Sequence, residues 1–122
     1  MGRALLGAGA LLGFLGVAAG AFGAHAMRAK LTPERLENWK TAADYQLWHA
    51  LATMFAGLAA ARWTSGAAAA AGWCFVAGTL VFSGSLYALA VTDRRKLGAI
   101  TPIGGVLFLL GWALLIVATL TA

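Results

Sequence analysis

The sequence has very little charge for a chain of 122 residues. Only four residues are acidic and nine are Lys or Arg, so charged residues make up 11% of the chain, against roughly 25% in soluble domains. Hydrophobic residues make up 61%, and so few charges do not cover the surface of a water-soluble domain of this size. The composition argues against a soluble monomer, a disordered chain and, despite the net charge of +5, a nucleic-acid-binding protein.

Other features that catalysis or redox chemistry requires are also scarce. Cys74 is the one cysteine, which excludes an internal disulfide. We find no nucleophile with a base and an acid at helical spacing, and no strand followed by a phosphate-binding glycine loop. We therefore predict a protein that is not an enzyme and that has no cofactor.

The sequence has instead four long runs without a formal charge, at residues 4–27, 45–61, 63–92 and 97–122. A bilayer core of about 30 Å needs roughly 20 helical residues, and backbone exposed to lipid must satisfy its own hydrogen bonds. We predict an all-α integral membrane four-helix bundle, a single domain of residues 1–122 with spans near 4–27, 43–62, 67–92 and 101–121. The runs contain no Asp or Glu, which argues against proton-coupled transport through a buried carboxylate.

The second run is short, but its helix gains length if it begins in the polar segment before it. Thr32, Pro33 and Glu34 form a typical helix start, with an N-cap, a proline at the first position and an acid in the first turn. We predict a helix that starts at Pro33 on the cytoplasmic membrane surface and continues into the second span. Trp39 then lies at the headgroup level.

The first run has a rival interpretation as a signal peptide. Arg3, an apolar run and the triplet 24–26 (AHA) resemble such a peptide with its cleavage site. The run is longer than the 7–15 apolar residues usual in a signal peptide, so we favour a retained helix.

The basic residues are distributed unevenly between the connections. Four spans place Arg3 and Arg62 on one side and the seven other basic residues on the opposite side. The positive-inside rule assigns the seven to the cytoplasm and both termini to the outer side of the membrane. At the cytoplasmic end we expect Glu37 or Asp44 to pair with an arginine; the candidates are Arg28, Arg94 and Arg95.

Glycine recurs at helical spacing. Gly2, Gly9, Gly16 and Gly23 repeat every seven residues, and small residues in membrane helices allow close backbone approach. We expect the first helix to pack closely on a neighbour, within the chain or in a second copy or other membrane protein. Shorter stripes occur in the other spans: Ala43, Ala50 and Gly57; Ala71, Gly78, Ser85 and Thr92; Gly104, Gly111 and Ala118.

Polar residues within the spans are candidate functional residues, because they are costly at membrane depth. With the topology above they all fall in the cytoplasmic half: His25, Tyr45, Gln46, His49, Ser83, Ser85, Tyr87 and Thr101. The cluster either joins the helices by hydrogen bonds or forms a pocket for a lipid headgroup or small ligand. A third interpretation, haem or metal ligation by His25 and His49, lacks further ligands. Trp112 lies deep in the last span, so its indole N–H needs an internal partner that the sequence does not identify.

Several motifs resemble one known family. The segments are 20–26 (GAFGAHA), 39–51 (WKTAADYQLWHAL), 82–87 (FSGSLY) and 97–105 (LGAITPIGG), followed by Gly111 and Trp112. In this order and spacing the chain resembles the YgdD-like family of small bacterial inner-membrane proteins, a domain of unknown function (DUF423, also UPF0382). The resemblance implies four membrane helices and no assigned catalytic residues.

Together these observations predict a non-enzymatic structural or accessory membrane protein, whose polar cytoplasmic end binds a lipid, ligand or partner. The expected partners are membrane lipids and, through the glycine-rich faces, a second copy or another membrane protein. The alternative is a small carrier or permeation pathway, which requires a continuous water-lined path from His49 to the outer face.

Overall fold

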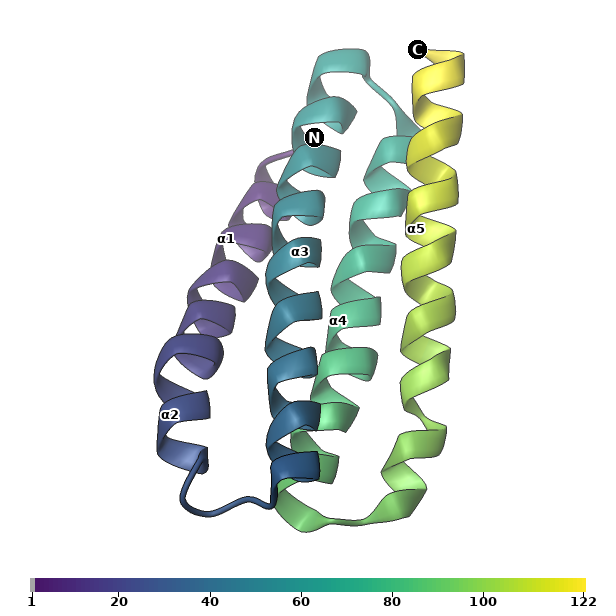
Figure 1. Ribbon diagram of the computed structural model, residues 1–122. Helices are drawn as coiled ribbons and strands as arrows, with labels where there is room; N and C mark the ends of the chain where they lie inside the picture. The colour runs from purple at the N-terminus through teal and green to yellow at the C-terminus, as the bar shows by residue number, and fades with distance from the viewer. Residues whose placement is uncertain (1) are drawn as a thin grey trace.

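The computed structural model describes residues 2–122, and all regular structure in this range is helical (Figure 1). The fold class predicted from the sequence, an all-α membrane bundle, is confirmed. The segments in chain order are α1 (Arg3–Val17), η1 (Ala18–Gly23), α2 (Ala24–Met27), α3 (Pro33–Trp63), α4 (Gly66–Thr92), η2 (Arg95–Ala99) and α5 (Thr101–Thr121).

The helix that starts at Pro33 continues without a break for 31 residues, as predicted. Thr32 caps it, because its hydroxyl accepts a hydrogen bond from the backbone N–H of Arg35 at 3.3 Å. Ser65 caps α4 in the same way through the N–H of Ala68 at 3.1 Å. Thr64 and Asp93 end α3 and α4 in the left-handed conformation, with φ of 50° and 56°.

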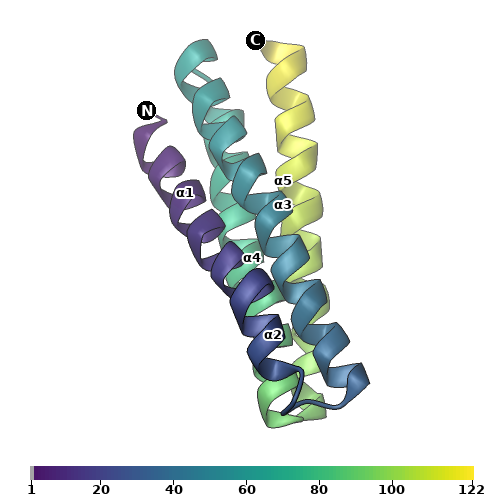
Figure 2. The same cartoon turned by 60° about the vertical axis from the view of Figure 1, so that its left-hand side comes forward.

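The helices form a row in the order α1, α3, α4, α5 (Figures 1 and 2). The helix α3 packs between α1 and α4, and α5 packs mainly on α4. The connections 28–32 and 93–100 lie at one end of the row, and both chain ends lie toward the other (Figure 1). An open row of this kind leaves grooves between helices that are second neighbours.

The glycine heptad of the first helix packs on α3 within the chain. A Cβ added at Gly9 would lie 2.7 Å from the carbonyl oxygen of Ala50, and one added at Gly16 would lie 2.9 Å from the side chain of Leu47. Both glycines are buried. This face is therefore covered by α3, and a partner that docks on it would have to displace α3.

Glycines and phenylalanines interlock between α4 and α5. Phe108 lies against Gly78, and Phe75 lies against Gly111, with distances of 2.6 Å from each added Cβ to the nearest ring carbon. Phe75 is fully buried. The small-residue stripes predicted for these two spans thus accept aromatic side chains from the facing helix.

The first helix contains a segment that the sequence did not predict. Residues 18–23 form a π-helical turn between α1 and α2, in which the N–H of Ala24 bonds to the carbonyl of Ala19. Such wide turns are uncommon and often lie at functional sites.

Three helical runs are long and apolar enough to cross a membrane: Arg3–Met27, Gly66–Thr92 and Arg95–Thr121. The helix α3 lies beside them, with a polar first part and an apolar second part that contains the predicted span 43–62. Large apolar side chains cover the outside of the bundle; Phe14, for example, is 74% exposed and Leu109 is 70% exposed. Such a surface suits lipid rather than water.

Candidate functional site

Gln46 joins three helices in the middle of the bundle. Its side-chain Nε2 donates to the carbonyl of Leu12 in α1 at 2.9 Å, and its Oε1 accepts from the hydroxyl of Tyr87 in α4 at 2.7 Å. Gln46 itself belongs to α3 and is buried. One amide therefore holds α1 and α4 against α3.

Trp39 makes a second link between α3 and the first helix. Its indole N–H donates to the carbonyl of Ala19 in the π-helical turn at 2.9 Å. The ring lies against Gly23 and meets the ring of Tyr87 edge-on, with centroids 4.7 Å apart. Trp39 thus points into the bundle, in a role that sequence reasoning did not assign to it.

Two serines of α4 connect it to its other neighbours. Ser83 donates to the carbonyl of Ala42 in α3 at 2.7 Å. Ser85 lies 2.6 Å from the hydroxyl of Thr101 at the start of α5. Both serines are buried, so their hydroxyl groups fix the position of α4 between α3 and α5.

His49 is buried and has a partner on each ring nitrogen. Its Nδ1 lies 2.8 Å from the carbonyl of Tyr45, and its Nε2 accepts from the indole N–H of Trp112 at 3.1 Å. A carbonyl only accepts, so Nδ1 carries the hydrogen and the ring is the neutral Nδ1–H tautomer. The ring also stacks on Phe108, with centroids 3.6 Å apart. His49 is therefore the internal partner of the Trp112 indole that the sequence did not identify.

The ring of Tyr45 takes part in the same aromatic group, because its centroid lies 4.5 Å from that of Phe82 and 4.9 Å from that of Trp48. His25 is the exception among the predicted cluster residues. It is exposed on α2, two residues after Gly23, which packs on Trp39. Two residues turn a helix by about 200°, so His25 faces away from α3.

His25 therefore does not belong to the polar cluster. The interpretation in which His25 and His49 together bind a haem or metal does not fit the structure. His25 and the buried His49 are not brought together, and both nitrogens of His49 are already engaged. Among residues 2–122 no group of three potential metal-ligating side chains occurs.

Arg35 organises the basic end, although the sequence analysis did not single it out. Its Nε donates to the carbonyl of Ala90 at 2.7 Å and its Nη2 to that of Val91 at 2.8 Å. These carbonyls belong to the last turn of α4, where helical partners are missing. A cation near a helix C-terminus is favourable, so this role of Arg35 could have been predicted. The prediction would have required knowing that α3 begins beside the end of α4.

The residues of the predicted charge cluster are all exposed: Arg28, Glu37, Asp44, Arg94 and Arg95. An ion pair among exposed side chains is worth at most about 1 kcal/mol. The pairing of Glu37 or Asp44 with an arginine stays a prediction.

The row of helices leaves a groove between α1 and α4, with α3 as its floor. Its volume is about 390 Å³, and its walls are mostly apolar. Leu5, which is buried against Gly72 and Gly57, closes the end near the chain termini. The lining residues of this α1–α4 groove are Leu12, Leu15, Ala19, Trp39, Gln46, Thr79, Leu80, Ser83, Gly84 and Tyr87.

The groove therefore contains three of the eight residues of the predicted polar cluster, Gln46, Ser83 and Tyr87, and their polar atoms are already paired. Across residues 2–122 no fully buried side-chain nitrogen or oxygen lacks a hydrogen-bond partner. The groove is mostly apolar, with a few fixed polar groups at one side. This is the usual pattern of a binding site for an apolar or amphiphilic molecule.

Comparison with known proteins identifies the family. The family model described as "Protein of unknown function (DUF423)" matches residues 19–105. The chain belongs to the DUF423 family. A UPF0382 membrane protein of Staphylococcus epidermidis is 48% identical over 112 residues, which cover 92% of this chain and 91% of that protein. The UPF0382 membrane protein YwdK of Bacillus subtilis is 42% identical over 111 residues, 90% of each chain. No solved structure matches the chain.

The DUF423 match contains most of the helix-joining side chains. Trp39, Gln46, His49 and Tyr87 all lie within residues 19–105, whereas Trp112 lies beyond them. The bacterial relatives are named as membrane proteins, and the chain has three helical runs able to cross a bilayer. This chain is accordingly a membrane protein of a family whose function is uncharacterised.

Proposed function

We propose that the chain is a non-enzymatic accessory protein of the bacterial inner membrane that binds a membrane lipid in the α1–α4 groove. The observation that carries the proposal is the groove itself. It is concave and mostly apolar, and the paired side chains of Gln46 and Tyr87 lie at its wall. An acyl chain along the groove would cover Leu12, Leu15 and Leu80 without breaking a hydrogen bond.

The polar side chains support a non-enzymatic role because they are committed to structure. Both nitrogens of His49 are engaged, and the hydroxyl of Ser83 donates to a backbone carbonyl of the neighbouring helix. A nucleophile or base would need a free lone pair facing its substrate. These groups stabilise the bundle instead.

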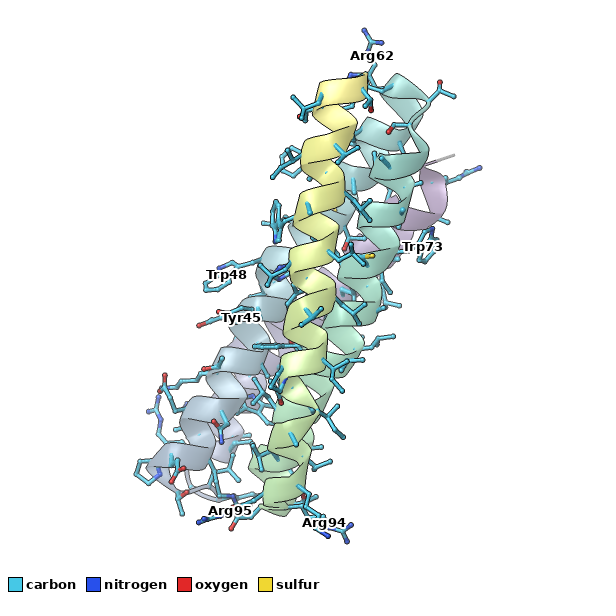
Figure 3. The ribbon with its side chains drawn as sticks, turned by 90° about the vertical axis from the view of Figure 1, so that its right-hand side faces the viewer. Tyr45, Trp48, Arg62, Trp73, Arg94 and Arg95 are labelled. Atoms are coloured by element: carbon cyan, nitrogen blue, oxygen red, sulfur yellow. The ribbon has the colours of Figure 1, made fainter. Side chains whose placement is uncertain are left out.

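The proposal includes an orientation with four spans. The end of the bundle that carries Arg94 and Arg95 is strongly basic, whereas Arg62 lies at the opposite end (Figure 3). The positive-inside rule then places the basic end in the cytoplasm and both termini outside. With this orientation α3 starts at the cytoplasmic surface and crosses the bilayer between α1 and α4.

Native mass spectrometry of the gently extracted protein tests lipid binding in this groove. Gly84 lines the groove, and a Cβ added there meets no atom within 4 Å, so Gly84→Phe fills the groove without disturbing the helices. Gly7 offers the matched control, since it is exposed on α1 with the same open space.

We expect the wild type and Gly7→Phe to retain phospholipid, and Gly84→Phe to retain at least one molecule less. Equal lipid retention in the two variants, with both folded by circular dichroism, would overturn the proposed site.

A further inference from the structure

A second groove lies on the other side of the row, between α3 and α5 with α4 as its floor. These two helices meet at few points, among them the hydrogen bond from Trp112 to His49 and the stacking of Phe108 on His49. Beside these contacts lies an open hollow of about 440 Å³, with Tyr45, Phe82 and Leu109 among its lining residues.

A second hollow follows along the same two helices, and we call the two hollows together the α3–α5 trench. Trp112 lines both hollows, and the second, of about 370 Å³, is also lined by Phe55 and Trp63. One leaflet is about half of the 30 Å hydrocarbon core, roughly 15 Å. Ten helical residues rise by about the same length, as between Tyr45 and Phe55. The trench is therefore long enough for one acyl chain of a single leaflet.

A charged pocket of about 370 Å³ lies at the basic end of the bundle, between the start of α3, the end of α4 and the start of η2. Its charged residues are of both signs, two arginines (Arg35 and Arg95) and two acids (Glu34 and Asp93). Their formal charges sum to zero, although the end of the bundle as a whole is basic. The pocket is therefore suited to a ligand that carries both charges rather than to a plain anion.

The pocket and the trench share one face of α3. Asn38 lines the pocket and Tyr45 lines the trench, and they are seven residues apart, which places them on the same side of the helix about 10 Å from each other. In Figure 3 Tyr45 lies above Arg95, which is at the lower end of the bundle. Arg35 is held in place by two carbonyls of α4, so part of the pocket is rigid before any ligand binds.

We propose that this pocket and the α3–α5 trench form a binding site for a zwitterionic aminophospholipid, a lipid with a phosphate and a primary ammonium in its headgroup. The phosphate pairs with the guanidinium of Arg95, and the ammonium donates to the carboxylates of Glu34 and Asp93. One acyl chain lies in the trench and runs from Tyr45 away from the basic end. The site is separate from the α1–α4 groove, so neither proposal depends on the other.

A competition experiment tests the choice of headgroup. The delipidated protein is mixed in detergent with equal amounts of phosphatidylethanolamine, phosphatidylglycerol and phosphatidylcholine of the same chains, and bound lipid is identified by native mass spectrometry. We expect phosphatidylethanolamine to be enriched at least five-fold over each of the others. Phosphatidylglycerol lacks the ammonium, and the quaternary nitrogen of phosphatidylcholine has no hydrogen to donate to the carboxylates.

Variants locate the site. Glu34→Gln combined with Asp93→Asn should abolish the preference, whereas Glu37→Gln should keep it, since Glu37 is an exposed acid of the same helix end that does not line the pocket. Gly105 lines the trench with open space around its Cβ position, so Gly105→Phe should remove the enriched lipid, while Gly84→Phe should retain it.

A preference for phosphatidylglycerol, equal binding of all three lipids, or an unchanged preference in Glu34→Gln/Asp93→Asn would each overturn the proposal. Loss of the enriched lipid in Gly84→Phe but not in Gly105→Phe would also overturn it, because the lipid would then occupy the α1–α4 groove.

Discussion

Two adjacent glycines of α5 provide a direct test of the packing. A Cβ added at Gly104 would lie 2.7 Å from the backbone Cα of Phe82 and 2.6 Å from its Cβ, whereas one added at Gly105 meets nothing within 4 Å. Ordinary contacts begin at 3.4 Å, so Gly104→Ala must separate α4 from α5 by at least about 0.8 Å. A gap of roughly 0.5–1 Å forfeits a quarter to a half of the dispersion energy of each contact that it opens.

The same substitution should therefore change stability in opposite directions at the two positions. Overpacking typically costs about 1–3 kcal/mol, so Gly104→Ala should be destabilised by that amount. Gly105→Ala should be stabilised by about 0.5–1 kcal/mol, because alanine loses less backbone entropy in a helix. The expected difference between the variants is about 1.5–4 kcal/mol.

Reversible unfolding in mixed micelles, followed by circular dichroism as the fraction of denaturing detergent rises, measures both variants against the wild type. The wild-type curve serves as the reference for both. Equal shifts for the two alanines, or a more stable Gly104→Ala, would refute the close approach of α4 and α5 at Phe82.

Three further predictions concern the polar contacts. Gln46→Leu and Tyr87→Phe should each destabilise the bundle. A double-mutant cycle should give a coupling between about 0.6 and 1.7 kcal/mol, the average and the maximum measured for hydrogen bonds between membrane helices; strict additivity would contradict the contact between Gln46 and Tyr87. Nitrogen NMR of His49 should show the Nδ1–H tautomer, and Trp112→Phe should shift its Nε2 resonance; an Nε2–H tautomer would disprove the hydrogen bond. Arg35→Met keeps the alkyl chain but removes both donors, so amide hydrogens in the last turn of α4 should exchange faster than in the wild type; unchanged exchange would count against this cap.

The sequence was sufficient to predict features that depend on spacing along one helix. The charge-free runs predicted the helices, Thr32 and Pro33 predicted the start of α3, and the heptad containing Gly9 predicted close packing of the first helix. Each of these signals is local. The structure that each signal predicts does not depend on which helix lies alongside.

Features that depend on the order of helices in space were not predictable in the same way. The partner of Trp112, the cap made by Arg35 and the two grooves all follow from the row α1, α3, α4, α5. His25 was wrongly grouped with the cluster because depth alone was considered. Its angle from Gly23 around the helix, which the sequence does contain, would have placed it on the opposite side.

The central claim is that lipid, and not water, fills the groove beside Gln46 and Tyr87. Solid-state NMR of the protein in bilayers tests it by comparing magnetisation transfer to Gly84 from lipid acyl protons with transfer from water. We predict strong transfer from acyl chains to Gly84 and none from water on the same timescale. Rapid transfer from water, continuing from the basic end to the opposite end of the bundle, would contradict the account and favour a permeation pathway.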